Sequence, residues 1–297
     1  MVIISGSSNP SLCKRIAKKG KLVQVPVEIT KFPNGEKRIY INKPLWNKDV
    51  IIVQSLSFPT DENIIELLLL IDAAKRVGAK TVTLFIPWFS YALQDRSYRF
   101  GEPISAKVVA NLLSNSGCDR IFLMDVHNEN ILGFFSLPTY HLTANDLFSR
   151  YIKKFLLRKN TVLVCPDISA VRRVQLLSEN LKLPLIFVDK RRDRRTGRVY
   201  AASVQGKVEG QAAILYDDGV ITGSTLIEAG RLLKKNGATS VNAIVTHMIL
   251  PQIPNTSTLF KLVDKLITTN SISHQISSPK IIELDISSIF IQALKYL

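Results

Sequence analysis

Two adjacent carboxylates follow an apolar segment and precede a run of small and hydroxyl-bearing residues. The expected strand 212–216 (AAILY) leads into Asp217 and Asp218, and residues 219–225 (GVITGST) lead into an expected helix over 225–236. A helix N-terminus offers free N–H groups and a positive dipole end, which suits a phosphate. Two neighbouring carboxylates can accept hydrogen bonds from sugar hydroxyls or hold Mg²⁺. This order favours a phosphosugar site, although an Asp-Gly turn with a capping Ser or Thr has the same local sequence.

Three further groups of polar residues follow expected strands. His127 comes after 120–124, Asp167 comes after 161–165, and the segment 190–198 (KRRDRRTGR) comes after 185–188 with a net charge of +5. Ligands of open α/β sheets bind beyond the carboxyl ends of the strands, so all three groups are candidates for one site. Taken singly, each also has a structural interpretation: a buried histidine, a helix N-cap, and a solvated basic loop or nucleic-acid contact.

Short β-branched runs alternate with longer amphipathic stretches, a pattern typical of α/β layering with a mostly parallel sheet. We expect strands at 2–4, 50–53, 80–86, 120–124, 161–165, 185–188, 212–216 and 241–246, and helices near 10–19, 62–77, 104–116, 145–157, 169–181, 225–236 and 286–296. The rhythm occurs twice, which predicts two similar doubly wound domains. We place them at 1–143 and 144–285, with the terminal helix 286–297 packing back on the first.

Composition narrows the class of protein. The 297 residues carry 39 Lys and Arg against 24 Asp and Glu, a net charge of +15, which favours an anionic partner such as nucleic acid or a phosphorylated small molecule. No apolar run is long enough for a membrane span, and the start of the chain does not read as a secretory signal. The cysteines at 13, 118 and 165 form no CxxC pair, which argues against a disulfide framework or a zinc knuckle and favours a reducing, cytoplasmic setting.

Several segments, in order along nearly the whole chain, resemble the ribose-phosphate pyrophosphokinases (phosphoribosyl-pyrophosphate synthetases), whose fold is of the type I phosphoribosyltransferase kind. The nine residues 217–225 resemble the family's ribose-5-phosphate loop. The other matching segments are 32–36 (FPNGE), 91–96 (YALQDR), 101–107 (GEPISAK), 125–127 (DVH), 133–135 (GFF), 165–167 (CPD), 189–192 (DKRR) and 269–272 (TNSI).

The resemblance implies transfer of the diphosphoryl group of ATP to the C1 hydroxyl of ribose 5-phosphate, with Mg²⁺ as cofactor. It implies catalytic roles for Lys190 and Arg192. The implied ATP-binding residues are Phe32, Asn34, Gly35, Glu36, Gln94, Arg96 and His127. The implied ribose-5-phosphate-binding residues are Arg192, Asp217, Asp218, Ile221, Thr222, Gly223, Ser224 and Thr225. The implied metal ligands are His127 and Asp167. It also implies a homo-oligomer with the adenine site at a subunit interface, and neither a membrane nor a nucleic-acid partner is expected.

Some positions depart from the family pattern. Leu93 stands where the family usually has Arg, Ile221 where it often has an acid or Ser, and Ser224 where it usually has Gly. Residues 169–170 are Ser-Ala in place of the usual Gly-Gly. The alternatives to an active enzyme are therefore a weakly active or regulatory paralogue, or a nucleic-acid-binding regulator of phosphoribosyltransferase fold. The chain has neither a Walker A pattern nor a GxGxxG pattern, so an ordinary P-loop kinase and a dinucleotide enzyme do not fit.

Overall fold

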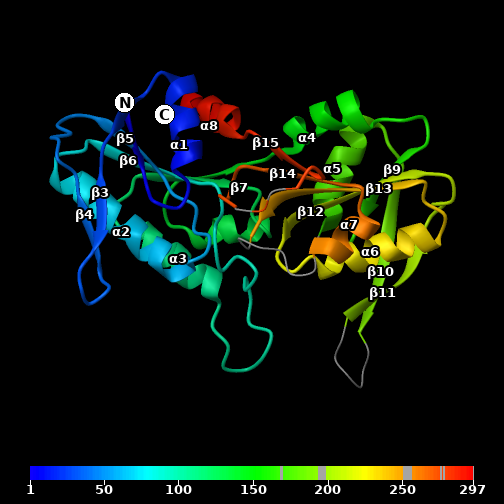
Figure 1. Ribbon diagram of the computed structural model, residues 1–297. Helices are drawn as coiled ribbons and strands as arrows, with labels where there is room; N and C mark the ends of the chain where they lie inside the picture. Colours follow the sequence, from blue (N-terminus) through cyan, green and yellow to red (C-terminus); the bar gives the residue numbers. More distant parts are fainter. Residues whose placement is uncertain (168–169, 193–198, 250–255, 275, 277, 297) are drawn as a thin grey trace. The chain divides into compact units, whose positions relative to one another are not determined.

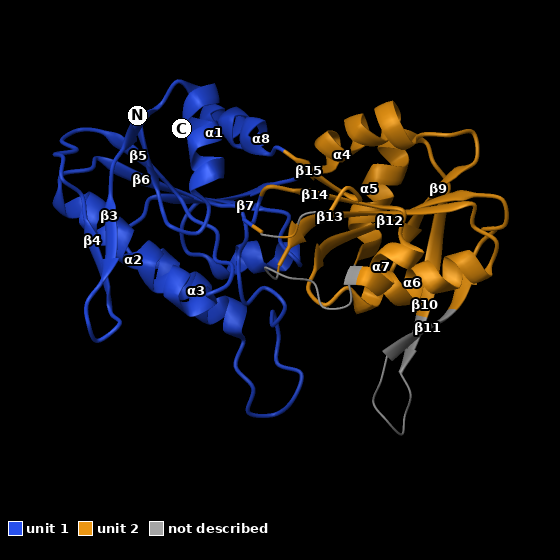
Figure 2. Ribbon diagram, viewed as in Figure 1, with its two compact units in different colours: residues 1–143, 271–273, 285–297 blue, residues 144–270, 274–284 orange. Residues whose placement is uncertain are grey.

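The computed structural model describes the chain except residues 168–169, 193–198, 250–255, 275, 277 and 297. The described chain divides into two compact units (Figure 2). Unit 1 comprises residues 1–143, 271–273 and 285–297, and unit 2 comprises residues 144–270 and 274–284. Each unit is built on a mostly parallel sheet with helices packed against it, which confirms the predicted fold class (Figure 1). Among the described helices, none combines the length and the apolar character that crossing a bilayer requires.

The main sheet of unit 1 has six parallel strands in the order β2-β1-β5-β6-β7-β8. Its strands are β1 (Val2–Ser5), β2 (Val23–Val25), β5 (Asp49–Val53), β6 (Thr81–Ile86), β7 (Arg120–Met124) and β8 (Thr139–Leu142). The helices are α1 (Pro10–Gly20), α2 (Thr60–Arg76), α3 (Ser105–Ser114), α8 (Ser287–Ala293) and the 3₁₀ turns Glu129–Phe134 and Leu294–Tyr296. Successive strand side chains point to opposite faces. Leu84 of β6 therefore joins the core formed with α2 and α3, and Phe85 packs on Phe290 of α8.

The end of the chain belongs to the unit that its beginning builds. Helix α8 packs on α1, and Lys19 Nζ lies 2.9 Å from Asp285 Oδ2 and donates a hydrogen bond to Ser288 Oγ at 3.0 Å. On the sheet side, the Phe290 ring lies 4.8 Å from the ring of Phe85, and both side chains are fully buried. Residues 287–293 therefore complete one face of the first sheet.

Unit 1 also contains a hairpin that the sequence analysis did not predict. Strands β3 (Glu28–Lys31) and β4 (Lys37–Tyr40) pair antiparallel as a sheet of their own, and β4 lies against α2. The hairpin is mostly exposed and rich in charge, so it lacks the apolar run by which the other strands were recognised.

Unit 2 has seven strands in the order β11-β10-β9-β12-β13-β14-β15, and every pair is parallel except β10 with β11. The strands are β9 (Thr161–Cys165), β10 (Leu185–Arg192), β11 (Val199–Gln205), β12 (Ala212–Val220), β13 (Ser240–Met248), β14 (Lys265–Thr269) and β15 (Ile281–Leu284). The helices are α4 (Asn145–Tyr151), a π-helical turn (Ile152–Leu156), α5 (Val171–Leu181), α6 (Ser224–Lys235) and α7 (Thr256–Leu262). On β12, Leu215 packs toward α6, while Tyr216 lies edge-on to Phe148 and donates to Asn145 Oδ1 at 2.7 Å.

Three expected strands of unit 2 were too short, and one of them, β13, runs from Ser240 to Met248 in place of 241–246. Strand β12 continues to Val220, because its pairing with β13 extends through Asp217 and Gly219, so both carboxylates lie on the strand and not in a loop. Strand β10 continues to Arg192, because residues 199–205 return antiparallel beside it. The basic segment expected as a loop thus begins as a strand.

Candidate active site

In unit 1, the carboxyl end of β7 carries the segment Asp125–His127. Asp125 is buried with a φ of 38°, a left-handed conformation that Asp tolerates better than most residues, and its N–H donates to Leu142 O at 2.9 Å. The N–H of Val126 donates to His141 Nε2 at 3.3 Å. These bonds hold the turn so that the half-buried His127 follows the end of the sheet directly.

The segment 91–96 meets this turn through one short hydrogen bond. Asn128 Nδ2 donates to Asp95 Oδ2 at 2.5 Å, and Arg96 Nε lies 3.8 Å from Asp95 Oδ1. The exposed Arg96 guanidinium also stacks over the Tyr98 ring, 5.3 Å from its centroid. The structure therefore brings together two of the segments singled out in the sequence, with an exposed cation available to an anionic ligand.

Gln94 is engaged at the start of a helix. Its Oε1 accepts a hydrogen bond from Ser105 Oγ at 2.5 Å, and its carbonyl accepts the Ala106 N–H at 3.2 Å. The second bond satisfies one of the N–H groups at the N-terminus of α3, which lack intrahelical partners, and the first ties Gln94 to the same turn. Gln94 thus has a structural role in addition to the nucleotide contact expected for it. Leu93, beside it, is 42% exposed and is free of the core.

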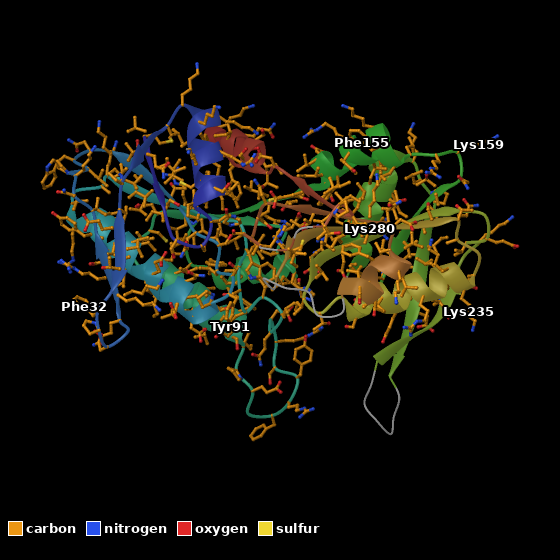
Figure 3. The ribbon with its side chains drawn as sticks, in the orientation of Figure 1. Phe32, Tyr91, Phe155, Lys159, Lys235 and Lys280 are labelled. Atoms are coloured by element: carbon orange, nitrogen blue, oxygen red, sulfur yellow. The ribbon has the colours of Figure 1, made fainter. Side chains whose placement is uncertain are left out.

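Residues 32–36 form the loop of the β3–β4 hairpin. Phe32 N–H donates to Glu36 O at 2.8 Å, Gly35 N–H to Phe32 O at 2.8 Å, and Glu36 N–H to Asn34 Oδ1 at 3.2 Å. Gly35 has a φ of 91°, which favours glycine at this turn. The Phe32 ring lies at the loop end of the hairpin, 47% exposed, with Arg38 5.9 Å from its centroid (Figure 3). An exposed, pre-formed aromatic platform of this kind suits a nucleobase.

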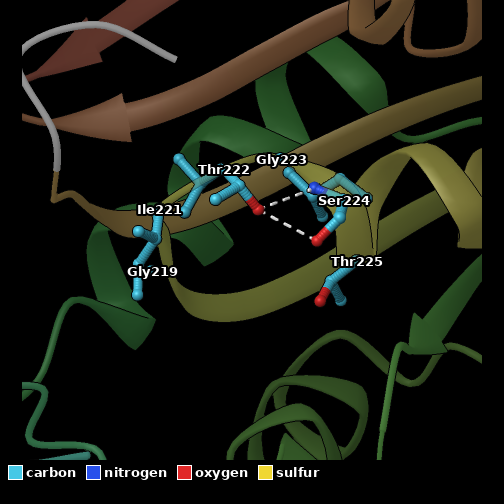
Figure 4. Close-up of a pocket in the computed structure, with 8 residues that line it drawn as sticks. Gly219, Ile221, Thr222, Gly223, Ser224 and Thr225 are labelled. Atoms are coloured by element: carbon cyan, nitrogen blue, oxygen red, sulfur yellow. Dashed lines mark hydrogen bonds between the residues drawn. The ribbon is translucent and has the colours of Figure 1, made fainter. Parts of the chain in front are cut away.

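In unit 2, a cavity of about 270 Å³ lies where β12 passes into α6 (Figure 4). Its lining is the continuous segment Gly219, Val220, Ile221, Thr222, Gly223, Ser224, Thr225 and Leu226. Gly223 has a φ of 79° and lets the chain turn into the helix. Thr222 Oγ1 lies 2.9 Å from Ser224 Oγ, so the hydroxyls converge at the first turn of α6. Backbone N–H groups, hydroxyls and a helix N-terminus together form a phosphate cradle.

The acidic pair lies beside this cavity with one buried cation. Asp217 and Asp218 are both buried, and Asp218 N–H donates to Asp217 Oδ1 at 2.9 Å. Burial raises the pKa of Asp217 well above its usual range, Asp218 and Asp167 raise it further, and the Arg173 guanidinium opposes them. Arg173 Nη1 lies 3.7 Å from Asp218 Oδ1, and both side chains are nearly buried. The site therefore concentrates negative charge where sugar hydroxyls or a divalent cation would relieve it.

Asp167 follows β9 as predicted and accepts the Ala170 N–H at 3.3 Å, so it caps the turn that leads into α5. The thiol of Cys165 donates to Asp167 O at 2.8 Å. All three cysteines are free and buried, and burial raises the pKa of the Cys13 thiol to about 11 and that of Cys165 to about 12. These thiols are protonated near neutral pH, so none of them is a nucleophile in this site.

The backbone of Lys190 and Arg192 lies on β10, where a β-bulge falls between Asp189 and Lys190 against Ser203 and Ala201. Bulges change the direction in which the following side chains point and occur often beside active sites. The side chains of Lys190 and Arg192, and residues 193–198, lie outside the described part of the chain.

The structure also identifies a residue that the sequence analysis missed. Arg173 was not singled out because its run, Val171–Val174, resembles any amphipathic helix start. Its proximity to the acidic pair arises only when α5 packs beside β12. Of the unusual positions, Ile221 and Ser224 line the cavity, whereas Ser169 lies outside the described residues.

Comparison with known proteins relates the whole chain to one activity. Residues 1–117 match the N-terminal domain of ribose phosphate pyrophosphokinase, and residues 137–277 match the phosphoribosyl transferase domain. The ribose-phosphate pyrophosphokinase of Fusobacterium nucleatum is 38% identical, covering 98% of this chain and 93% of that protein. The Rhizobium meliloti enzyme is 39% identical over 92% of this chain and 87% of that protein. The crystal structure of phosphoribosylpyrophosphate synthetase from Mycobacterium smegmatis superposes with a TM-score of 0.92 at 32% identity, covering 99% of this chain and 97% of that one.

Proposed function

The chain belongs to the ribose-phosphate pyrophosphokinase family, and from this premise we propose that it converts ATP and ribose 5-phosphate to AMP and phosphoribosyl pyrophosphate. The C1 hydroxyl oxygen of the sugar forms a bond to the β-phosphorus of ATP. The bond from that phosphorus to the oxygen bridging the α- and β-phosphates breaks, AMP leaves with the electron pair, and the hydroxyl proton is released.

The observation that best supports this assignment is the cavity at the start of α6. Its lining supplies N–H groups and hydroxyls for the 5-phosphate, and Asp217 and Asp218 stand beside it to accept hydrogen bonds from the ribose hydroxyls. Ser224 adds a side chain where the family usually has Gly, and Ile221 adds no polar group, but both residues keep their backbone N–H groups. We assign Thr222, Gly223, Ser224 and Thr225 to the phosphate and the acidic pair to the sugar.

Charge on the moving diphosphoryl group has to be balanced as the bond to AMP breaks. We assign Lys190 to that charge and Arg192 to the static phosphates, because an ammonium is a compact point charge and a guanidinium is a fixed fork of donors. The bulge at Lys190 is consistent with this assignment. Holding ATP and ribose 5-phosphate in line would account for much of the rate enhancement that charge stabilisation does not supply.

Kinase-like enzymes of this family use a divalent metal. Among the described residues no three potential ligands are grouped as a metal site, so Mg²⁺ would be held by one or two carboxylates of unit 2 together with substrate oxygens. Asp167, Asp217 and Asp218 are hard oxygen donors. Burial, and then the neighbouring carboxylates, raise the pKa of Asp217, and a divalent cation would offset both effects. Mg²⁺ bound there or at the ATP phosphates would supply positive charge to phosphate oxygens. We assign Asp167 to one metal position and His127 to the metal or the ATP phosphates at the other.

We assign ATP to unit 1 and ribose 5-phosphate to unit 2. Phe32 would stack on adenine, with Asn34, Gly35 and Glu36 at its polar edge, while Gln94, Arg96 and His127 would contact the rest of the nucleotide. The hairpin loop is exposed, which is compatible with donation of the adenine site to a neighbouring subunit of a homo-oligomer. Because all three thiols are buried and unpaired, we place the enzyme in a reducing cytoplasm.

The decisive experiment is product analysis with ATP, ribose 5-phosphate and Mg²⁺. AMP and phosphoribosyl pyrophosphate should form together and only when all three are present. ADP in place of AMP would mean single phosphoryl transfer and would overturn the proposal. The nucleic-acid-binding alternative is not favoured, because the relatives that cover the chain nearly end to end are pyrophosphokinases. It would require tight binding of DNA or RNA that weakens steeply with salt, without turnover.

A further inference from the structure

The hairpin that carries residues 32–36 has little support of its own. Two-stranded hairpins are marginally stable in water, and the only residues of β3 and β4 that are not exposed are Ile29, Lys37 and Ile39. Ile39 packs on the core of unit 1. The position of the loop therefore depends on how the loop end of the hairpin is attached to the rest of the unit.

Two lysines flank the loop and stand opposite each other at the loop end of the hairpin. Lys31 pairs with Lys37 in the hairpin register, an arrangement in which like charges repel. Helix α2 presents Glu62 and Glu66 to them, one helical turn apart. Lys31 Nζ lies 2.7 Å from Glu62 Oε2, and Lys37 Nζ lies 2.5 Å from Glu66 Oε2 and 3.8 Å from Glu62 Oε2.

The two ion pairs differ in burial. In the Lys31–Glu62 pair the side chains are 48% and 45% exposed, so water and salt screen it and it should contribute little. In the Lys37–Glu66 pair they are 11% and 0% exposed. Removing one partner of such a buried pair leaves an uncompensated charge in the interior, which is strongly unfavourable.

Glu66 is also tied to the rest of unit 1 by both carboxylate oxygens. Oε1 accepts hydrogen bonds from Ser7 N–H at 2.6 Å and Gln54 Nε2 at 2.9 Å, and Oε2 accepts one from Ser7 Oγ at 2.6 Å. Gln54 Oε1 in turn accepts Ser8 Oγ–H at 2.7 Å. Lys37 is therefore ion-paired to a carboxylate whose position is already fixed by hydrogen bonds from the β1–α1 turn and from the residue that follows β5.

We propose that Glu66 is a positioning residue for adenine recognition, acting through Lys37 to hold the loop 32–36 in its nucleotide-binding position. This inference rests on the proposed function, because it takes that loop as the adenine contact. It assigns a role in positioning the adenine loop to Glu66 and Lys37. Both residues lie outside the loop, and neither contacts the reacting atoms. Lys31 and Glu62, on the same two elements, have no such role and supply a matched control.

The test compares Lys37→Met with Lys31→Met, using steady-state kinetics and hydrogen exchange of the hairpin amides. Lys37→Met should raise KM for ATP by roughly 10- to 100-fold, the range expected when a binding group is displaced by about 1 Å. KM for ribose 5-phosphate should stay within about twofold of wild type. Lys31→Met should leave both within about twofold. Lys37→Arg, which keeps a cation opposite Glu66, should recover part of the loss.

A second variant guards against a folding defect. Glu66→Gln with Lys37→Met buries no charge, so it should fold even if Lys37→Met alone does not, and it should still raise KM for ATP because the ionic attachment is gone. Equal changes in KM for both substrates, or no change for ATP in this double variant, would overturn the proposal.

Hydrogen exchange separates this inference from the assigned activity, since it needs no ATP. Faster exchange of amides 29–39 in Lys37→Met but not in Lys31→Met supports the attachment, and equal exchange in the two variants overturns it. If wild type forms no AMP, the proposed function fails, while the exchange experiment still decides whether the buried pair holds the hairpin.

Discussion

Arg173 places a cation against the acidic pair, and its removal offers a quantitative test of the site. Its Nη1 lies 3.7 Å from Asp218 Oδ1, with the two side chains 13% and 8% exposed. At an effective dielectric constant of about 20, unit charges at this separation attract by about 4 to 5 kcal/mol. Removing one partner of a buried pair typically costs 3–5 kcal/mol. We therefore expect Arg173→Met to lower the free energy of unfolding of unit 2 by about 3–5 kcal/mol at neutral pH.

Urea unfolding followed by hydrogen exchange at β9 and β12 would measure this loss, because those strands form the middle of the unit 2 sheet. Arg231→Met, at an exposed position of α6 in the same unit, is the control and should cost less than about 1 kcal/mol. Adding Asp218→Asn to Arg173→Met should recover most of the loss, since the neutral amide no longer needs the guanidinium. A cost below 1 kcal/mol for Arg173→Met, or additive losses in the double variant, would refute the reasoning.

Three further predictions follow from the same geometry. Without divalent cations, the free energy of unfolding should fall as pH rises from about 4 through the raised pKa of Asp217, because this carboxyl loses its proton at a lower pH in the unfolded chain than in the folded one. Asp217→Asn should reduce this pH dependence in urea titrations at several pH values. An unchanged pH dependence would contradict the assignment. Lys190→Ala should lower kcat by about 10²–10³ with little change in KM for ribose 5-phosphate, whereas Asp217→Ala should chiefly raise that KM; small, equal effects on kcat would place the active site elsewhere. Leu93→Arg should lower KM for ATP, because the new guanidinium can add a charge-assisted contact to phosphate worth at most about 1.5–3 kcal/mol of binding free energy. An unchanged KM would mean that position 93 does not face the nucleotide.

The parts of the fold that could be predicted are those whose signal is local. Strands β7 and β9 were predicted with their observed bounds because they are apolar on both faces and end at polar residues. Asp217 and Asp218 were singled out for a similar reason, since an apolar run leads into two carboxylates a few residues before a helix. Local residue order is enough for such features.

The parts that were missed depend on contacts between distant segments. The β3–β4 hairpin is charged and exposed, and its attachment comes from Glu66 on α2. The extension of β10 requires its partner strand β11, and the role of Arg173 requires α5 to pack beside the acidic pair. Periodicity reports which face of an element is buried, but it does not report which charge lies opposite it.

Because the C-terminal helix α8 belongs to unit 1, unit 1 cannot complete its folding during synthesis until after unit 2 has been synthesised. Residues 1–143 emerge first, yet the sheet face that contains Phe85 is covered only when Phe290 has been synthesised. At about 5–20 residues per second, the 147 residues from 143 to 290 take roughly 7–30 s to synthesise, and Phe85 lacks its contact with Phe290 for that time. Unit 1 is therefore synthesised first and completed last. A chain without residues 286–297 would lack the part of the unit 1 core that Phe290 supplies.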